Sequence, residues 1–236
     1  MIFFFAIFFS FFSYYNENCE RFLLLLDASH GKKVEVMTNS LTTDRRVAKS
    51  KAALKQALLG WMSRKEFGEI TITDIVESAE LNRGTFYKHY SCKEQLLDDI
   101  LSDVLSDLIR AYRYPYANMK NFDVQMLRPS NIKIFDHVQN YAAVYTLMVK
   151  TNSLPEFKNR IYETLKHLYL ADMTELSPNP AIDKEVMACY QANAVLGIMT
   201  EWVQNNFKHN PAYLAEQLVE LTRLNRSQES YLSNLD

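Results

Sequence analysis

Apolar residues recur at helical spacing along most of this chain. Leu54, Leu58 and Trp61 fall at i, i+4 and i+7 and predict a helix over residues 45–63. A second helical face comprises Met187, Tyr190, Ala194, Val195, Ile198, Met199 and Trp202. A third stripe comprises Leu214, Leu218, Leu221 and Leu224. No stretch shows the alternation typical of a strand ladder, so the pattern predicts an all-α protein.

Capping residues and prolines set the ends of the predicted helices. Thr71 and Asp74 form a capping box that opens a short helix ending near Ala79. Asn82 precedes a second short helix, Arg83 to about His89, and Ser91 with Glu94 opens a long helix to about Tyr112. Further helices are predicted over 131–139 and 141–150, from the Ser153–Glu156 capping box to Leu176, from Asn179-Pro180 as the longest helix, and from Asn210-Pro211.

The first 36 residues differ in composition from everything that follows. The opening run of about 15 apolar residues is shorter than the roughly 20 that a membrane-spanning helix needs. A secretory signal would have a Lys or Arg before the apolar run and a small-residue cleavage site after it, and this segment has neither. We interpret residues 1–36 as a mis-assigned upstream extension, with Met37 as the working start. The alternative is a weak membrane anchor.

Composition and charge narrow the class of protein. The 236 residues are 48% hydrophobic and include only 5 Gly and 6 Pro, which excludes a disordered chain and disfavours collagen, β-sandwiches and glycine-loop α/β enzymes. Residues 44–94 hold 10 Lys and Arg against 7 Asp and Glu, a net charge of +3. Residues 95–236 hold 13 against 17, a net charge of −4. This asymmetry favours an anionic partner at one end only.

Two predicted short helices have the size and spacing of a helix-turn-helix. Each has about seven residues, and a turn of three or four residues joins them between two longer helices. The second carries hydrogen-bond donors at Arg83, Thr85, Tyr87, Lys88 and His89. Lys93 starts the next helix, where the helix dipole disfavours a cation unless it faces an anion such as a DNA phosphate. An ordinary solvated connector remains the alternative at this point.

The run ITITDIVESAELNRGTFYKHYSCKEQLLDDIL resembles the DNA-binding signature of the TetR/AcrR family of transcriptional regulators. The resemblance covers Lys51 to about Leu101. It is carried by Ile70-Thr71, Asp74-Ile75, Ala79, Asn82 through Tyr87, His89-Tyr90, Lys93-Glu94 and Leu96-Leu97. A looser similarity to one subgroup's ligand domain is carried by Gly197-Ile198, Trp202, Asn210-Pro211 and Ala215 through Leu218.

The resemblance implies a role for each matching residue. Thr71 and Thr73 would contact phosphate, and Asn82, Arg83, Gly84 and Thr85 would begin the recognition helix, with Arg83 and Thr85 near base edges. Tyr87, Lys88 and His89 would combine backbone contacts with base readout, and Lys93 would clamp a further phosphate. These roles agree with the way in which N-terminal residues of a recognition helix enter the major groove.

Three positions depart from the family pattern. Many members have Gly where this chain has Glu66 and Glu80. Glu80 falls in the turn, where a left-handed residue is usual and a side chain costs about 1 kcal/mol. Cys92 replaces the usual cap of the following helix, so we expect Ser91 to cap it and the helix to start one residue early.

The sequence lacks the spacings of a catalytic or metal site. Its five histidines match no metal-ligand motif, and His137, next to a predicted helix break, is expected to be satisfied or exposed. Cys19, Cys92 and Cys189 form no disulfide or metal framework and are expected to be reduced thiols. No phosphate-binding glycine loop or nucleophile elbow is present. We therefore predict a protein that is not an enzyme and uses no cofactor or metal.

These observations predict three regions: 1–44, an atypical apolar extension outside the fold; 45–92, a helix-turn-helix DNA-binding domain; and 93–236, a helical regulatory and dimerisation domain. We predict a cytoplasmic, ligand-responsive repressor that binds a palindromic double-stranded operator as a homodimer. The alternatives are a ligand-independent or activating regulator of the same fold, and a membrane-tethered helical interaction protein. A pocket for a small apolar or aromatic effector is expected at Leu108, Tyr112, Tyr145, Met148, Tyr169 and Met173. The dimer interface is expected at Tyr190, Ala194, Ile198, Trp202, Leu214, Leu218 and Leu221.

Overall fold

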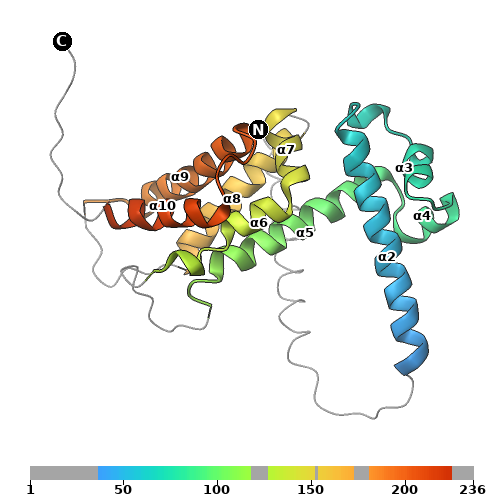
Figure 1. Ribbon diagram of the computed structural model, residues 1–236, viewed down its shortest axis with the longest axis horizontal. Helices are drawn as coiled ribbons and strands as arrows, with labels where there is room; N and C mark the ends of the chain where they lie inside the picture. Colours follow the sequence, from blue (N-terminus) through green and yellow to red (C-terminus); the bar gives the residue numbers. More distant parts are fainter. Residues whose placement is uncertain (1–36, 118–126, 152–153, 173–180, 225–236) are drawn as a thin grey trace, which may run out of the picture. The chain divides into compact units, whose positions relative to one another are not determined.

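The computed structural model describes residues 37–117, 127–151, 154–172 and 181–224, all of them helical or in turns and loops. The chain divides into two compact units, Met1–Arg46 and Val47–Asp236. The helices are α2 (Met37–Met62), α3 (Ile72–Ser78), α4 (Arg83–His89), α5 (Lys93–Arg113), α6 (Ile134–Asn140), α7 (Ala142–Lys150), α8 (Pro155–Asp172), α9 (Lys184–Gln204) and α10 (Pro211–Leu224) (Figure 1). Short 3₁₀ turns lie at Phe67–Glu69 and Pro129–Asn131. The all-α prediction is confirmed.

Helices α2, α3 and α4 enclose a small core. Leu54 and Leu58 of α2, Ile75 of α3 and Phe86 of α4 are fully buried. The indole nitrogen of Trp61 donates to the Asp74 backbone oxygen at 2.9 Å and to Ser78 Oγ at 2.8 Å, which ties α2 to α3. The periodic positions of the sequence thus become the buried face of a three-helix unit.

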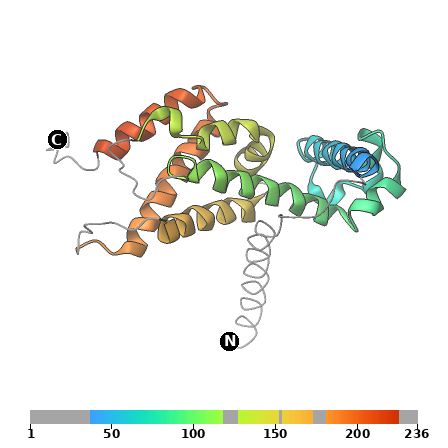
Figure 2. The same cartoon turned by 90° about the horizontal axis from the view of Figure 1, so that it is seen from below.

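Helix α5 runs from this unit into the C-terminal bundle. At its start, Asp99 accepts hydrogen bonds from Tyr90 Oη at 2.7 Å and lies 2.9 Å from the Lys55 ammonium, which also binds Asp103 at 2.6 Å. Further along, α5 packs against α6 and α8 (Figure 2). At its end, the guanidinium of Arg113 binds Asp172 of α8 through two hydrogen bonds of 2.7 and 2.9 Å.

Small residues bring α8 and α9 together. Ala188 and Ala192 of α9 are buried, and α9 makes its most extensive contact with α8. Both side chains are therefore buried within their own chain.

Several helix starts confirm the capping analysis, and the start of α9 corrects it. The capping box of Thr71 and Asp74 and the Asn82 cap are present, and Asn210 Oδ1 accepts from the Tyr213 amide at 2.8 Å. The helix expected from Asn179-Pro180 instead begins at Lys184, because Asp183 Oδ1 caps it by accepting from the Val186 amide at 3.0 Å. Among the helices that the structure describes, α2 is the longest, with 26 residues. Ser153, Asn179, Pro180 and Leu176 lie outside the described residues.

Candidate nucleic-acid interface

The start of α3 is held by a closed set of hydrogen bonds. Thr71 Oγ1 accepts from the Asp74 amide at 3.1 Å, and the Thr71 amide donates to Asp74 Oδ2 at 2.8 Å. The Lys65 ammonium lies 2.9 Å from the same carboxylate. The hydrogen bond from Lys65 and those from Thr71 lower the pKa of Asp74 to about 2. Thr71, an expected phosphate contact, is exposed and fixed at the first turn of α3.

The start of α4 is capped by Asn82. Its Oδ1 accepts from the Thr85 amide at 2.8 Å and from Thr85 Oγ1 at 3.1 Å. A Cβ at Gly84 would lie 3.2 Å from that same oxygen, which is closer than an ordinary van der Waals contact. Within the free protein, Gly84 therefore leaves room for the cap of its own helix.

The remaining predicted contacts of α4 point to solvent. Arg83 and Lys88 are exposed, and Tyr87 is 57% exposed although its ring is large and apolar. The Arg83 guanidinium donates to Thr73 Oγ1 and so joins α4 to α3. Phe86, next to Tyr87, is fully buried and anchors the helix from its inner side. The geometry presents a short helix with an arginine, a tyrosine and a lysine outward on a rigid base.

His89 lies among cations. Partial burial lowers its pKa from the ordinary 6.5, and the charges of Lys51 and Lys88 lower it further. Lys51, on α2, lies 5.3 Å from the ring centroid of Tyr90 and 3.7 Å from Asp99. The sequence analysis noted the net positive charge of residues 44–94 but assigned Lys51 to no site. Only the packing of α2 beside the end of α4 brings its charge to the recognition helix.

The ammonium of Lys93 contacts the connector between α2 and α3. It donates to the backbone oxygens of Phe67 at 2.7 Å, Gly68 at 3.0 Å and Ile70 at 2.7 Å. It also lies 4.8 Å from the centroid of the Phe67 ring. The helix-dipole argument had required an anion opposite Lys93; in the structure the partial negative charges of these carbonyl oxygens lie there instead. Whether Lys93 also binds phosphate stays a prediction.

The three departures from the family pattern have clear consequences. Glu80 adopts a φ of 53°, so the left-handed turn residue is confirmed. The expectation for Ser91 was wrong: α5 starts at Lys93, and Cys92 occupies the N-cap position without a side-chain hydrogen bond that caps the helix. Ser91 instead donates its amide to Gln95 Oε1 at 2.7 Å, because the glutamine side chain reaches back over the helix start. Glu66 lies before the 3₁₀ turn in extended backbone, with φ −63°.

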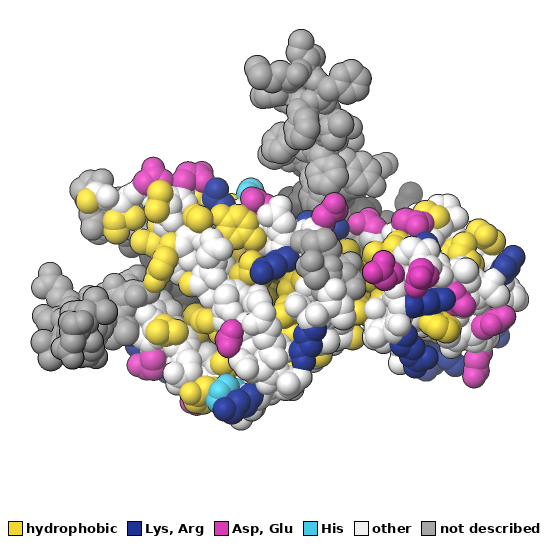
Figure 3. Space-filling model, turned by 90° about the horizontal axis from the view of Figure 1, so that it is seen from above, with side chains coloured by type: hydrophobic (Ala, Val, Ile, Leu, Met, Phe, Trp, Pro, Cys, Tyr) yellow, Lys and Arg dark blue, Asp and Glu magenta, His cyan; other side chains and the backbone are white. Residues whose placement is uncertain are grey.

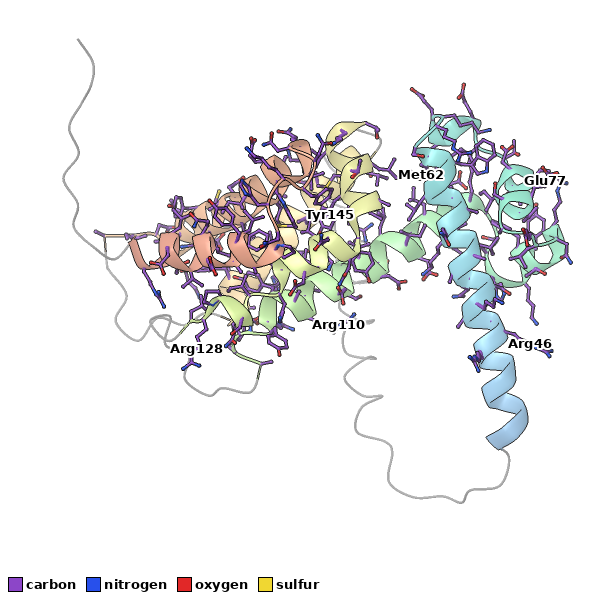
Figure 4. The ribbon with its side chains drawn as sticks, in the orientation of Figure 1. Arg46, Met62, Glu77, Arg110, Arg128 and Tyr145 are labelled. Carbon is purple, nitrogen blue, oxygen red and sulfur yellow. The ribbon has the colours of Figure 1, made fainter. Side chains whose placement is uncertain are left out.

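The expected effector pocket is largely packed core. Leu108 and Tyr145 are fully buried, Met148 is 2% exposed, Tyr112 and Tyr169 are partly exposed, and Met173 lies outside the described residues. Burial, with smaller contributions from Asp172 and Tyr169, raises the pKa of Tyr112 to about 12. Figure 4 shows Tyr145 inside the C-terminal bundle and Arg110 at its edge. A groove of about 470 Å³ lies elsewhere, between α9 and α10.

His137 belongs to a buried chain of hydrogen bonds. Of the two expectations for it, a hydrogen-bonded or an exposed histidine, the first is confirmed. Its Nδ1 lies 2.7 Å from Asp107 Oδ2 of α5, and its Nε2 lies 2.9 Å from Tyr145 Oη of α7. Asp107 also accepts from the Arg110 guanidinium at 2.7 Å. Three helices thus meet at one imidazole.

The expected dimer residues fall into two groups. Tyr190, Ala194 and Leu221 are exposed and Ile198 and Leu218 are partly exposed, whereas Trp202 and Leu214 are buried in their own chain. Val186, 64% exposed, and Ile182, 46% exposed, extend the row of Tyr190 along α9 and its approach. In Figure 3, apolar side chains gather over the C-terminal helices, whereas charges of both signs crowd the part formed by α2 to α4.

Two negative observations apply to the described residues. No group of three or more His, Cys, Asp and Glu side chains among them is arranged to hold a metal ion. No described helix combines the length and the apolar content that crossing a membrane requires.

Fold and site together define a helix-turn-helix protein whose α4 is a candidate recognition helix joined to a C-terminal helical bundle. Residues 57–100 match the model described as bacterial regulatory proteins, tetR family, and residues 126–224 match the model described as transcriptional regulator C-terminal region. The chain belongs to the TetR family of transcriptional regulators. The resemblance seen in the sequence is confirmed.

Individual relatives agree with this assignment. An uncharacterized HTH-type transcriptional regulator of Bacillus subtilis (strain 168), YxbF, is 24% identical over 178 residues, which cover 75% of this chain but 45% of that protein. The chain therefore spans under half the length of that relative. A TetR transcriptional regulator structure from Streptococcus agalactiae 2603V is similar with a TM-score of 0.52 and 21% identity, covering 77% of this chain and 98% of that one. The dihydroxyacetone kinase operon activator DhaS has a TM-score of 0.51 and 16% identity, covering 75% and 95%. These two structures share the fold.

Proposed function

We propose that the protein is a repressor that binds a palindromic DNA operator as a homodimer and responds to a small apolar or aromatic effector, acting in the cytoplasm. The observation that carries the DNA-binding part is the outward row of Arg83, Tyr87 and Lys88 on α4. This row stands on a helix that Asn82 caps and the fully buried Phe86 anchors. A recognition helix needs such a rigid base, because its side chains must reach base edges and phosphates together.

The proposed contacts divide by chemistry. Arg83, at the start of α4, carries the donors that suit a guanine edge, and Thr85 lies beside it. Tyr87, Lys88 and His89 combine a hydroxyl, a cation and an imidazole for phosphate and base contacts, and Lys51 adds a second cation near them. Thr71 and Thr73 supply hydroxyls for phosphates at the start of α3. Asn82 and Gly84 contribute through the cap that orients α4.

Selection of bound duplexes from a random DNA library at low salt tests this proposal. We expect enrichment of a sequence with two related half-sites. Arg83→Ala should relax the preference at one position and cost roughly 1–3 kcal/mol there. Lys158→Ala, which removes an exposed cation on α8, is the matched control and should bind as the wild type does. Failure of the wild-type protein to enrich any sequence would overturn the proposal.

The dimer is proposed on the exposed apolar row of α9. Val186 and Tyr190 are both more than half exposed, and Ile198 continues their row four residues beyond Ala194. Leu218 and Leu221 provide apolar surface on α10. Twofold copies of two such helices form a four-helix interface, and a dimer places recognition helices about 34–36 Å apart for two half-sites.

A regulator of the same fold that needs no effector is the second candidate. It is favoured by the close packing of Leu108, Tyr145 and Met148, which fill the expected pocket with the chain's own side chains. A screen of apolar and aromatic compounds against the thermal midpoint and operator affinity distinguishes the two. A compound that raises the midpoint and weakens operator binding supports the effector-responsive repressor. No response across the screen, with normal operator binding, supports the second candidate.

A further inference from the structure

The ammonium of Lys93 has as many acceptors as it has donors. It carries three N–H groups, and three backbone oxygens lie within 3.0 Å of it. The side chain reaches these oxygens across the face of the Phe67 ring. A phosphate could gain this ammonium only by taking hydrogen bonds away from carbonyl groups.

The three carbonyl groups belong to one turn. Phe67 and Gly68 lie in the 3₁₀ turn between α2 and α3, and Ile70 follows its end as a nearly fully buried residue. Backbone oxygens at the end of a helical turn carry negative partial charge, so a cation there stabilises the turn. Charge-assisted hydrogen bonds are also stronger than neutral ones. Lys93 therefore closes a turn that has few other bonds of its own.

The bonded turn lies between the start of α5 and the start of α3. Lys93 is the first residue of α5, and Ile70 immediately precedes Thr71, the N-cap of α3. The other end of α5 is fixed to α8 through Arg113 and Asp172. A movement of the first turn of α5 would thus displace Ile70, and with it the adjacent Thr71 and its hydroxyl.

We propose that Lys93 is a positioning residue, which holds Thr71 at a fixed place relative to α5 and affects DNA affinity through that link rather than by contact with phosphate. The inference rests on the proposed binding of DNA by α3 and α4. It assigns Lys93 a role different from the phosphate clamp that the family resemblance implies, and it identifies the route by which α5 sets the position of α3.

The salt dependence of DNA binding separates the two roles. Each phosphate contact made by a cation contributes about 0.9 to the slope of log K against log salt concentration. Lys93→Met keeps the aliphatic stem over Phe67 but removes the charge, and Lys93→Arg keeps the charge but replaces the compact ammonium by a planar fork. At a temperature where circular dichroism shows both variants folded, we expect each to bind the selected duplex about tenfold more weakly, with the slope of the wild type.

Other outcomes overturn the proposal. Because the proposed dimer carries two copies of Lys93, a phosphate clamp predicts a slope lower by about 1.8 for Lys93→Met and near-normal affinity for Lys93→Arg. Unchanged affinity in both folded variants would show that Lys93 serves stability alone. Lys88→Met is the matched control: Lys88 is an exposed cation on α4, and its loss from both subunits should lower the slope by about 1.8.

Hydrogen exchange on the DNA-free protein keeps the test independent of the proposed function. If Lys93 holds the turn, Lys93→Met should speed exchange of the amides of residues 69–74, and Lys88→Met should not. Unchanged exchange in Lys93→Met would overturn the positioning role even if no DNA sequence were found. If amide exchange is faster in Lys93→Met but the wild type binds no DNA, the proposed function is refuted and the positioning role of Lys93 stands.

Discussion

The Nε2 atom of His137 lies 2.9 Å from the hydroxyl oxygen of Tyr145, in a region where both side chains are almost completely buried. The carboxylate of Asp107 lies 2.7 Å from the other ring nitrogen. Burial lowers the pKa of His137, and the opposing effect of Asp107 does not cancel it. Burial by itself would raise the pKa of Asp107, but its hydrogen bonds from His137 and Arg110 bring that pKa below 3.8. We therefore infer a neutral imidazole that donates from Nδ1 to an ionised carboxylate and accepts from Tyr145.

Tyr145→Phe should destabilise the protein although it removes a single oxygen atom. The substitution leaves His137 Nε2 buried without a donor, and such a loss costs about 1–3 kcal/mol. Urea unfolding at pH 7 measures the change. Tyr169→Phe, at a partly exposed tyrosine of α8, is the comparison and should cost less. Equal costs for the two variants would contradict the importance of the His137 hydrogen bond.

Stability should fall as the pH is lowered from 7 to 5. The folded-state pKa of His137 lies below the ordinary 6.5, so the unfolded chain takes up the proton more readily. The contribution of His137 to stability is therefore complete above pH 6.5 and is lost as the pH falls toward its lowered folded-state pKa. His89 has a lowered pKa as well and acts in the same direction. Unfolding free energies of wild type and His137→Gln at both pH values test the assignment, because the variant should lose less stability on acidification.

Glu80→Gly should stabilise the protein by about 1 kcal/mol. Glu80 has a φ of 53°, where a side chain is strained and glycine is not. Glu77→Gly is the matched control, since Glu77 is exposed in α3 and glycine in a helix costs about 1 kcal/mol. Thermal unfolding of both variants should show a gain of stability for Glu80→Gly and a loss for Glu77→Gly. A loss of stability in Glu80→Gly would show that its side chain makes a compensating contact.

Cys92→Ser should also stabilise the protein, by about 1 kcal/mol, because a hydroxyl can cap α5 where the thiol does not. The backbone of Cys92 already has the extended conformation of an N-cap, with φ −153° and ψ 170°. Ser91→Ala provides the comparison and should change the free energy of unfolding by less, since Ser91 does not cap the helix. A larger change in the free energy of unfolding for Ser91→Ala would show that Ser91 caps α5.

Ile198→Glu and Leu221→Glu should each yield monomers that lose affinity for a palindromic duplex. Both positions lie on the proposed interface, where a buried carboxylate would have no partner. Tyr114→Glu is the control, because Tyr114 is 57% exposed outside that surface. Static light scattering at micromolar concentration reports the mass. A monomeric wild-type protein would refute the proposed dimer.

The local features of the DNA-binding region followed from sequence because their causes are local. The capping box of Thr71 and Asp74, the Asn82 cap and the left-handed Glu80 each depend on residues within three or four positions. The same holds for the lengths of α3 and α4. Two helix starts were predicted wrongly because a nearby side chain offered another hydrogen bond. Gln95 accepts from the Ser91 amide, and Asp183 rather than Pro180 sets the start of α9.

The tertiary structure decided which groups meet across elements. Lys93 and Ile70 are separated by 23 residues, and no spacing rule indicates that an ammonium would reach that carbonyl. The same is true of Asp107, His137 and Tyr145, which three different helices bring together. A helical stripe also does not reveal its partner: Trp202 and Ile198 share the predicted face, but packing buries the first in its own chain and leaves the second partly exposed. Periodicity determines that a side is apolar, whereas only the folded arrangement of the other helices determines what covers it.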